Sequence, residues 1–334
     1  MRPGTFSPVS RTIIISGAAG FVGSNLSKRL LDAGHRVIGV DNFSYGSRSN
    51  LEAVLGHERF SFLERDLTEP KALSSVEGDT IVHLASQKIP RYTNSYRTIE
   101  ENNVMSSLVI KRALELGARL VFASTSDVYG KNPHVPFSEE SDLVLGPSKV
   151  KRWAYAASKI HSEHKLIATG EEKGLKYTIL RLFGSYGPNQ NLTWWGGPQS
   201  VFIGKALRNE TIELHGTGQQ TRTFTYVDDT VQGFQLCIEQ EAAANEVFNV
   251  ASDPSTEVTI EQLARLIWKL IRPQDEGPKL TMIPYASFGG GYEDVQRRVP
   301  DISKIKALLG FEPKYGLEEG LRRTISWQRG QPEA

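Results

Sequence analysis

The chain of 334 residues contains a single cysteine, Cys237, which excludes an intramolecular disulfide. This cysteine lies in an apolar stretch with helical spacing, so we expect a buried and unreactive thiol. The sequence also lacks the run of about 20 apolar residues that a membrane span needs, and its start lacks the apolar core of a signal peptide. We therefore expect a cytoplasmic protein without a membrane partner.

An excess of charge of either sign is also missing. The chain has 39 basic and 38 acidic residues, which gives a formal net charge of +1. This balance argues against a nucleic-acid-binding protein, because such proteins carry a clear positive excess. Hydrophobic residues make up 39% and charged residues 23% of the chain, as in an ordinary globular protein. We predict no metal site.

Short runs rich in β-branched residues alternate with amphipathic stretches of helix length. The hydrophobicity of these runs is continuous rather than alternating, which predicts parallel strands covered by helices on both faces. The sequence therefore indicates an α/β fold of the Rossmann type, with a doubly wound parallel sheet. We expect strands near 12–16, 36–40, 60–63, 80–84, 119–123 and 177–181, and helices near 25–33, 98–116 and 155–170.

The regular alternation ends near residue 184, where clusters of glycine and proline begin. Beyond this point we expect a smaller, mixed α/β domain that caps the carboxyl edge of the sheet, and two strands, at 224–227 and 246–250, that return to the main sheet. The predicted parts are a main domain of 11–183 joined by 223–251, a cap of 184–222 and 252–330, and a flexible extension of 1–10.

A glycine-rich loop, Gly17-Ala-Ala-Gly20-Phe-Val-Gly23, separates the first predicted strand from the first predicted helix. Glycines in this setting permit a tight turn and a close approach of the backbone to a pyrophosphate at the helix N-terminus. Asp41 ends the second strand, where a carboxylate binds ribose hydroxyls and repels a 2′-phosphate, so we predict NAD rather than NADP. The residues that we assign to this part of the cofactor site are Gly17, Gly20, Phe21, Val22, Gly23, Asp41 and Asn42.

The glycine spacing resembles that of the extended short-chain dehydrogenase/reductases, and in particular the NAD-dependent nucleotide-sugar epimerase/dehydratase family. The resemblance extends along the whole chain. It implies that the carboxylate in the pair Asp66-Leu67 meets the adenine amino group, and that the loop containing Leu84, Ala85 and Ser86 passes the cofactor pyrophosphate.

Tyr155 and Lys159 lie four residues apart, on one face of a predicted helix. We expect the lysine and the positive nicotinamide to lower the pKa of Tyr155, so that it can act as a base, and Lys159 to hold the nicotinamide ribose. By position, Thr125 matches the family residue whose hydroxyl binds the reacting sugar oxygen. Together these residues would remove the proton from a sugar C4 hydroxyl while a hydride passes to NAD. Ser126 and Asp127 follow as further catalytic candidates.

The later part of the chain resembles the family's site for a nucleotide diphosphate sugar. Arg222 stands where a family arginine grips phosphate, a task that suits the forked guanidinium. Gly184 replaces an asparagine that is common there, which removes one expected contact to the substrate. Trp194 and Trp195 could cover a sugar or could simply be buried. The residues that we assign to substrate binding are Lys88, Thr125, Ser126, Gln199, Arg222 and Arg298.

The groups around the oxidised sugar decide the outcome after C4 oxidation. The 4,6-dehydratases of the family carry an adjacent Asp-Glu pair after the catalytic threonine, whereas this chain has Ser126 and Asp127, which argues against dehydration. Two segments, 151–159 and 291–302, resemble UDP-glucuronate decarboxylases and UDP-apiose/xylose synthases. In those enzymes an arginine in the position of Arg298 and a glutamate in that of Asp127 surround the sugar carboxylate.

Epimerisation at C4 needs no extra catalytic acid, so we favour inversion of C4 in a UDP-hexose or UDP-hexuronate. The alternative is a UDP-glucuronate decarboxylase that forms UDP-xylose or a 4-keto-pentose. A hypothesis from another class, a non-catalytic NAD-binding regulator, is disfavoured because Tyr155 and Lys159 are both intact. The helices near 98–116 and 155–169 match those of a four-helix interface in family dimers, which implies a homodimer.

Overall fold

The computed structural model describes residues 10–88, 94–288 and 293–331. Residues 1–9 of the expected N-terminal extension lie outside this range. In the described part, seven parallel strands form one sheet in the order β11-β6-β5-β4-β1-β2-β3. The strands are β1 (Thr12–Ser16), β2 (Arg36–Asp41), β3 (Phe60–Glu64), β4 (Thr80–His83), β5 (Arg119–Thr125), β6 (Tyr177–Leu182) and β11 (Glu246–Val250). The predicted doubly wound α/β fold is confirmed.

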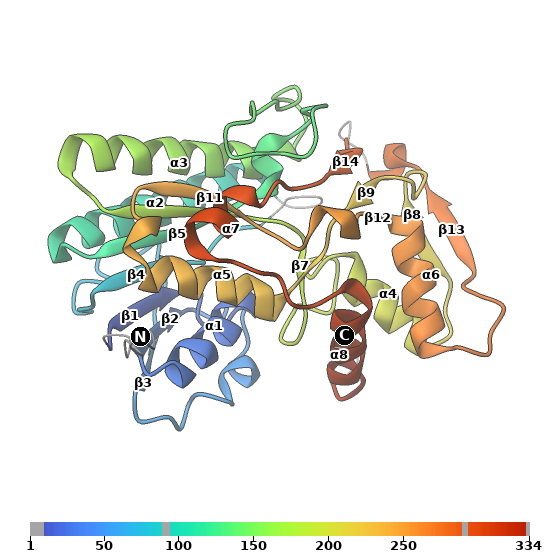
Figure 1. Cartoon of the computed structure of the whole chain (residues 1–334), viewed down its shortest axis with the longest axis horizontal. Coiled ribbons are helices and arrows are strands. Elements are labelled where there is room, and N and C mark those ends of the chain that lie inside the picture. The colour runs from blue at the N-terminus through green and yellow to red at the C-terminus, as the bar shows by residue number, and fades with distance from the viewer. Residues whose placement is uncertain (1–9, 89–93, 289–292, 332–334) are drawn as a thin grey trace, which may run out of the picture.

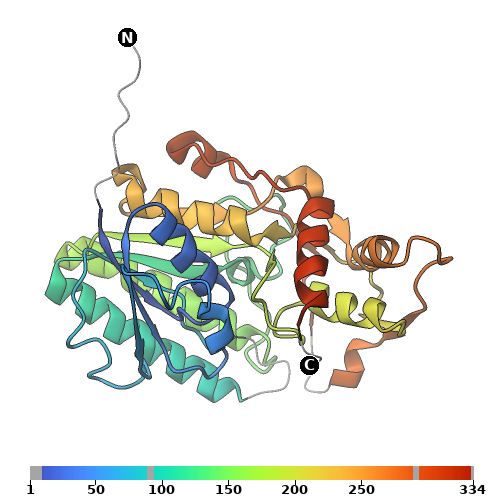
Figure 2. The same ribbon diagram turned by 90° about the horizontal axis from the view of Figure 1, so that it is seen from below.

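Helices cover both faces of this sheet (Figure 2). Helices α1 (Phe21–Asp32) and α5 (Val227–Glu239) pack on one face, and α2 (Ser95–Leu116) and α3 (Trp153–Lys173) pack on the other. Strand β1 shows why its run is continuously apolar, since Ile13 and Ile15 join the core on the α1 side while Ile14 joins the core on the α2 side. Cys237 is fully buried in α5, as predicted.

All seven strands are parallel, so their carboxyl ends lie at one edge of the sheet, and the strand order reverses between β1 and β4. Ligands of doubly wound sheets bind at this edge, outside the carboxyl ends of the strands. Helix α1 begins at Phe21, four residues earlier than the predicted start at residue 25. Its first turn therefore contains the last glycine of the glycine-rich loop, and its N-terminus lies directly at the edge.

Most of the remaining elements lie beyond the carboxyl edge of the sheet (Figure 1), whereas α7 (Ser303–Leu309) packs against β11 of the main sheet. Two small sheets form there, one pairing β8 with β13 and the other ordered β12-β9-β14, and α6 packs against α4. Helix α6 starts with a capping box between Thr259 and Gln262 and buries an apolar stripe that includes Leu263 and Ile267. The elements are α4 (Pro198–Leu207), β8 (Ile212–His215), β9 (Thr221–Arg222), β12 (Val258–Thr259), α6 (Ile260–Ile271), β13 (Leu280–Ile283), β14 (Arg297–Arg298), α7 (Ser303–Leu309) and α8 (Leu317–Arg329). The exact division into two domains stays a prediction.

One predicted strand does not return to the main sheet. Strand β10 (Thr225–Tyr226) pairs with β7 (Ser185–Tyr186) in a separate parallel pair, so the prediction for 224–227 is wrong. The physical reason is that β11 already occupies the edge beside β6, and the chain turns into α5 directly after Tyr226. Strand β11 does return, as predicted for 246–250.

Helices α2 and α3 pack side by side along the outer face of the sheet, where the resemblance placed a dimer interface. The homodimer stays a prediction. None of the helices within the described ranges combines the length and the apolar character that crossing a membrane requires.

Candidate active site

A cleft of about 610 Å³ opens between the carboxyl edge of the sheet and the cap. The sequence-predicted residues that line it come from the glycine-rich loop, the ends of β4 and β5, α3, α4, β9 and β14. They are Gly17, Gly20, Phe21, Val22, Gly23, Leu84, Ser86, Lys88, Thr125, Ser126, Asp127, Tyr155, Lys159, Gln199, Arg222 and Arg298. Five others, Asp41, Asn42, Asp66, Leu67 and Ala85, do not line it. In the part of the chain that the structure describes, no three His, Cys, Asp or Glu side chains are placed to hold a metal ion.

The glycine-rich loop has a backbone path that excludes larger residues. A Cβ atom on Gly23 would lie 2.1 Å from the carbonyl oxygen of Gly17, because the first turn of α1 packs directly on the loop. Residues of this turn line the cleft at the N-terminus of α1. The first backbone N–H groups of a helix have no partner within it, and such a positive helix end is the arrangement that binds a pyrophosphate. These residues fit the phosphates of NAD.

Asp41 lies behind the wall of the cleft and supports the loop. Its Oδ2 accepts a hydrogen bond from the N–H of Ala19 (3.0 Å), and its Oδ1 accepts one from the N–H of Phe43 (2.8 Å). Burial raises the pKa of Asp41, and these backbone hydrogen bonds oppose the rise. A carboxylate has room for further donors, so a ribose hydroxyl can still reach it. Contact of Asp41 with a ribose stays a prediction.

The four other assigned cofactor residues that do not line the cleft are also set back from it. The Nδ2 atom of Asn42 donates to Oδ2 of Asp66 (3.0 Å), which joins the ends of β2 and β3. The side chain of Leu67 is buried in the core, so only its backbone could meet a cofactor. Ala85 is half-buried and packs against Gly17.

The catalytic candidates lie together at the ends of β5 and α3. The hydroxyls of Thr125 and Ser86 lie close enough to the Tyr155 phenol to lower its pKa. One turn further along α3, the Nζ atom of Lys159 donates to the carbonyl of Ala123 (3.0 Å), and all three of Thr125, Tyr155 and Lys159 are buried. The predicted helical face is thus present, and it points into the cleft.

The pKa of Tyr155 shifts opposite to our prediction. Burial raises the pKa of the Tyr155 phenol, and the negative charge of Asp127 raises it further. Lys159 does not compensate, because its Nζ atom lies 5.9 Å from the centre of the Tyr155 ring and burial lowers the pKa of this lysine to about 7. The polypeptide alone therefore disfavours the phenolate, and the positive charge of an oxidised nicotinamide would be the group that favours it.

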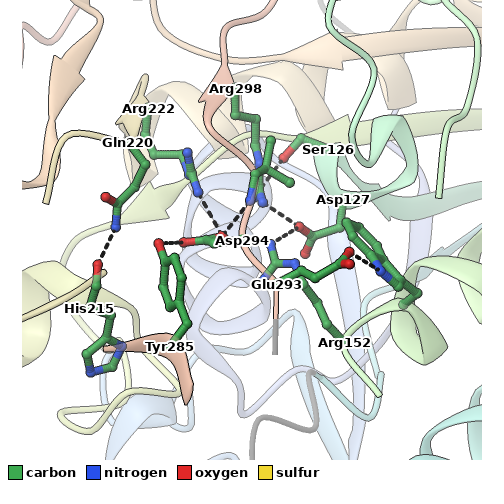
Figure 3. Close-up of polar contacts among 12 residues, drawn as sticks. Ser126, Asp127, Arg152, His215, Gln220, Arg222, Tyr285, Glu293, Asp294 and Arg298 are labelled. Atoms are coloured by element: carbon green, nitrogen blue, oxygen red, sulfur yellow. Dashed lines mark hydrogen bonds and ion pairs between the residues drawn. The ribbon is translucent and has the colours of Figure 1, made fainter. Parts of the chain in front are cut away.

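Three arginines and two aspartates form a second cluster in the cleft, which we call the arginine cluster (Figure 3). It consists of Asp127, Arg152, Arg222, Asp294 and Arg298. The Oδ1 atom of Asp127 lies 2.6 Å from Arg298 Nη2 and 3.3 Å from Arg152 Nη2. The Oδ1 atom of Asp294 lies 3.0 Å from Arg222 Nη2 and 3.3 Å from Arg152 Nη2. Arg152 thus links two ion pairs into one chain.

The arginine cluster has more positive than negative groups, and all five side chains are largely buried. Burial alone would raise the pKa of Asp127, but the charges of Arg298, Arg152, Arg222 and Lys88 lower it overall. Burial is also the main cause that lowers the pKa of Arg222 to about 10. Buried cations in excess attract anions, so this end of the cleft fits a substrate with several negative charges.

Sequence reasoning assigned no role to Arg152 or Asp294. A signal was present for the first, since Arg152 precedes Tyr155 by three residues and helical spacing of three brings side chains together. Asp294 precedes Arg298 by four residues in an irregular segment, and nothing in that pattern predicts a contact with Arg152. Only the folded chain brings these residues together.

The two tryptophans both line the cleft and both contact other rings. The ring of Trp194 stacks on His215, with centroids 4.2 Å apart, and Trp195 contacts Tyr45 at 5.0 Å. The backbone carbonyl of Trp195 also accepts a hydrogen bond from Lys88 Nζ (3.1 Å). The loop with the tryptophans therefore joins the cap to the loops that follow β2 and β4.

Gly184 adopts a backbone conformation that explains the missing asparagine. Its φ is +47°, and a Cβ atom there would lie 2.7 Å from the carbonyl oxygen of Thr223. A side chain at this position would therefore force the backbone of two segments apart. Gly184 contributes to the wall of the cleft through its backbone alone.

Comparisons with known proteins agree with this geometry. Residues 13–251 match the family described as the NAD dependent epimerase/dehydratase family. The chain is 37% identical to UDP-glucuronic acid decarboxylase 1 of Xenopus tropicalis over 97% of this chain and 73% of the relative. It is 32% identical to UDP-N-acetyl-alpha-D-glucosaminuronate decarboxylase of Bacillus cytotoxicus, over 96% and 98%. The crystal structure of UDP-glucose 4-epimerase from Thermotoga maritima, with UDP-glucose, is similar with a TM-score of 0.83 and 30% identity, over 95% of this chain and 98% of that one.

Proposed function

Because this chain belongs to the NAD-dependent epimerase/dehydratase family, we propose that it decarboxylates a nucleotide-activated hexuronate, with UDP-glucuronate as the substrate. The observation that carries this proposal is the arginine cluster, which has three buried guanidiniums and two carboxylates at the sugar end of the cleft. A UDP-hexuronate brings negative charge both in its diphosphate and in the carboxylate at C5. A UDP-hexose lacks the second group and would leave one guanidinium without a substrate partner.

We assign different parts of the cofactor and the substrate to different residues along the cleft. Bound NAD would accept the hydride from C4, held by the loop of Gly17 to Gly23 and by Lys159. We assign Arg222 to the diphosphate and Arg298 to the sugar carboxylate. Both guanidiniums point into the same space from neighbouring strands (Figure 3), which supports a shared role in binding an anionic substrate. The hydroxyls of Thr125 and Tyr155 then meet the C4 oxygen.

The chemistry follows from that placement. Tyr155 takes the proton of the C4 hydroxyl as a ketone forms, and Thr125 donates a hydrogen bond to the ketone oxygen. The carboxylate is now β to a ketone, so the bond between C5 and C6 can break with its electrons delocalised into an enolate. Carbon dioxide leaves, the protonated Tyr155 stabilises the enolate oxygen, and C5 accepts a proton to give a 4-keto-pentose. Return of the hydride would complete a UDP-pentose.

This proposal replaces our first choice from the sequence, which was C4 epimerisation. The relatives named as decarboxylases match the chain over nearly its whole length, and they favour the alternative. Epimerisation stays a second candidate on one observation, the 2.6 Å ion pair between Arg298 and Asp127. This pair neutralises the arginine and so fits a neutral hexose, the kind of sugar that the similar UDP-glucose 4-epimerase holds.

The test is to incubate the NAD-loaded chain with UDP-glucuronate and, separately, with UDP-glucose. Proton NMR would follow the sugar, and trapping would follow carbon dioxide. Decarboxylation predicts a UDP-pentose or 4-keto-pentose and one carbon dioxide per product, lost in Tyr155→Phe and in Arg298→Met. Inversion of C4 without carbon loss would establish the epimerase instead. Bound NAD without turnover of either sugar would favour the non-catalytic regulator.

A further inference from the structure

Arg152 occupies the central position of the arginine cluster. It stands directly before the first residue of α3, three residues before Tyr155, and its side chain is only 7% exposed. Its Nη2 atom lies 3.3 Å from Oδ1 of Asp127 and 3.3 Å from Oδ1 of Asp294 (Figure 3). No step described above uses it, although it lines the same cleft.

Binding of a sugar carboxylate creates a competition in this cluster. Arg298 is bonded to Asp127 at 2.6 Å, and its other nitrogen, Nη1, donates to the hydroxyl of Ser126 at 3.5 Å. A carboxylate that arrives at Arg298 must share or displace Asp127. A buried carboxylate that loses its cation without a replacement is strongly destabilised, which would oppose substrate binding.

Arg152 removes this obstacle. The same oxygen of Asp127 that bonds Arg298 already lies within reach of Arg152, so Asp127 can shift from one guanidinium to the other by a small movement. Arg152 has a second ion-pair partner, because its Nη2 atom also lies 3.3 Å from Oδ1 of Asp294. The ion pair with Asp294 can therefore hold Arg152 while Asp127 moves.

We propose that Arg152 is a specificity-determining residue that accepts Asp127 when the substrate carboxylate takes Arg298, and so makes the site selective for acidic sugars. This inference rests on the proposed function, since only a hexuronate brings a carboxylate to Arg298. Arg152 acts through Asp127 and does not touch the reacting atoms. A neutral sugar leaves the pair of Asp127 and Arg298 intact and gains nothing from Arg152.

A purely structural role for Arg152 makes a different prediction. Trp153 anchors the start of α3 separately, because its Nε1 atom donates to Oε2 of Glu293 (3.2 Å). If Arg152 only held the segment of residues 293–298 against α3, its loss would weaken UDP, UDP-glucose and UDP-glucuronate alike. If it receives Asp127, its loss would weaken UDP-glucuronate alone.

The experiment uses isothermal titration of the NAD-loaded full chain in a Tyr155→Phe background, so that the ligand is not consumed. UDP, UDP-glucose and UDP-glucuronate are titrated into this chain and into the same chain with Arg152→Met. We expect UDP-glucuronate affinity to fall at least about tenfold, because Asp127 loses the only other guanidinium within ion-pair distance of it among the described residues, and the other two affinities to change by less than about threefold. Lys151→Met, at the exposed neighbouring position, is the matched control and should change none of the three.

A second variant separates the action of Arg152 through Asp127 from a general loss of charge. In Asp127→Asn there is no carboxylate at position 127 for Arg152 to bind. Adding Arg152→Met should then lower the affinity for UDP-glucuronate by less than about threefold. An equal loss for all three ligands, or a loss that persists fully beside Asp127→Asn, would refute the role of Arg152. If the chain with native Arg152 binds UDP-glucuronate no better than UDP-glucose, the proposed function and this inference both fail.

Discussion

The cofactor end and the substrate end of the cleft are built in opposite ways. At the cofactor end, residues 17–23 follow one another in the chain, and their backbone shape makes the site. At the substrate end, the arginine cluster joins residues from four distant segments, and their charges make the site. A site formed by the backbone of one short loop tolerates few substitutions, but a sequence motif predicts it. A site formed by charged side chains from distant segments cannot be predicted in this way, because only the fold brings the side chains together.

Tyr155 lies where the two ends meet, and its loss is the largest change that we predict. Tyr155→Phe removes the hydroxyl that lies near those of Thr125 and Ser86 and leaves the ring in place. We expect kcat to fall by roughly a thousandfold, because a positioned general base is missing. NAD content of the purified chain and affinity for UDP should stay within about twofold of the native values. Loss of NAD together with activity would contradict this separation.

The predictability of the site follows the same division. The seven main strands and the glycine loop could be predicted because continuous apolar runs and glycine spacing are local signals. Arg222 and Arg298 could be placed only by resemblance, and Arg152 and Asp294 were missed because their contact spans more than a hundred residues of chain. The prediction for β10 failed for a similar reason, since the place beside β6 is taken by a strand that comes later in the sequence.

Gly23 tests whether shape alone controls the cofactor end. Gly23→Ala adds one methyl group and no charge, yet its Cβ atom would meet the Gly17 carbonyl oxygen at 2.1 Å. We expect NAD affinity to fall about a hundredfold and the free energy of unfolding to fall by about 1–3 kcal/mol, as in other overpacked sites. Titration of NAD and urea unfolding measure the two effects. Gly56→Ala is the control, because beyond the adjacent residues no atom lies within 4 Å of its added methyl group. An equal loss of NAD affinity in that variant would contradict the role of the close packing at Gly23.

A substitution of Asp41 tests whether charge also contributes to cofactor binding. Asp41→Ala removes the acceptor for the N–H groups of Ala19 and Phe43 and the charge that should repel a 2′-phosphate. We expect NAD affinity to fall by about tenfold and NADP affinity to fall much less, so that the preference for NAD over NADP becomes smaller. Parallel titrations of NAD and NADP give both values. A native chain that already prefers NADP would show that Asp41 has only the loop-supporting role.

The smallest effect that we predict is a change in how the free energy of unfolding depends on pH, and it comes from Lys159. Burial lowers the pKa of Lys159 to about 7 from an ordinary value of 10.5. Below pH 7 the lysine is charged in the folded and unfolded states, and the full cost of burying the charge is present. Between about pH 7 and 10.5 the unfolded chain keeps a proton that the folded chain has lost, so this residue makes the free energy of unfolding rise with pH.

In Lys159→Met that contribution is absent, and the rise in urea midpoint of the NAD-free chain from pH 7 to pH 9 should be smaller than in the native chain. Lys111→Met is the control, since the Lys111 side chain is 74% exposed, and it should keep the native slope. Equal slopes in all three chains would mean that Lys159 stays charged on folding. A reduced slope would show that the chain buries this lysine at a cost in stability.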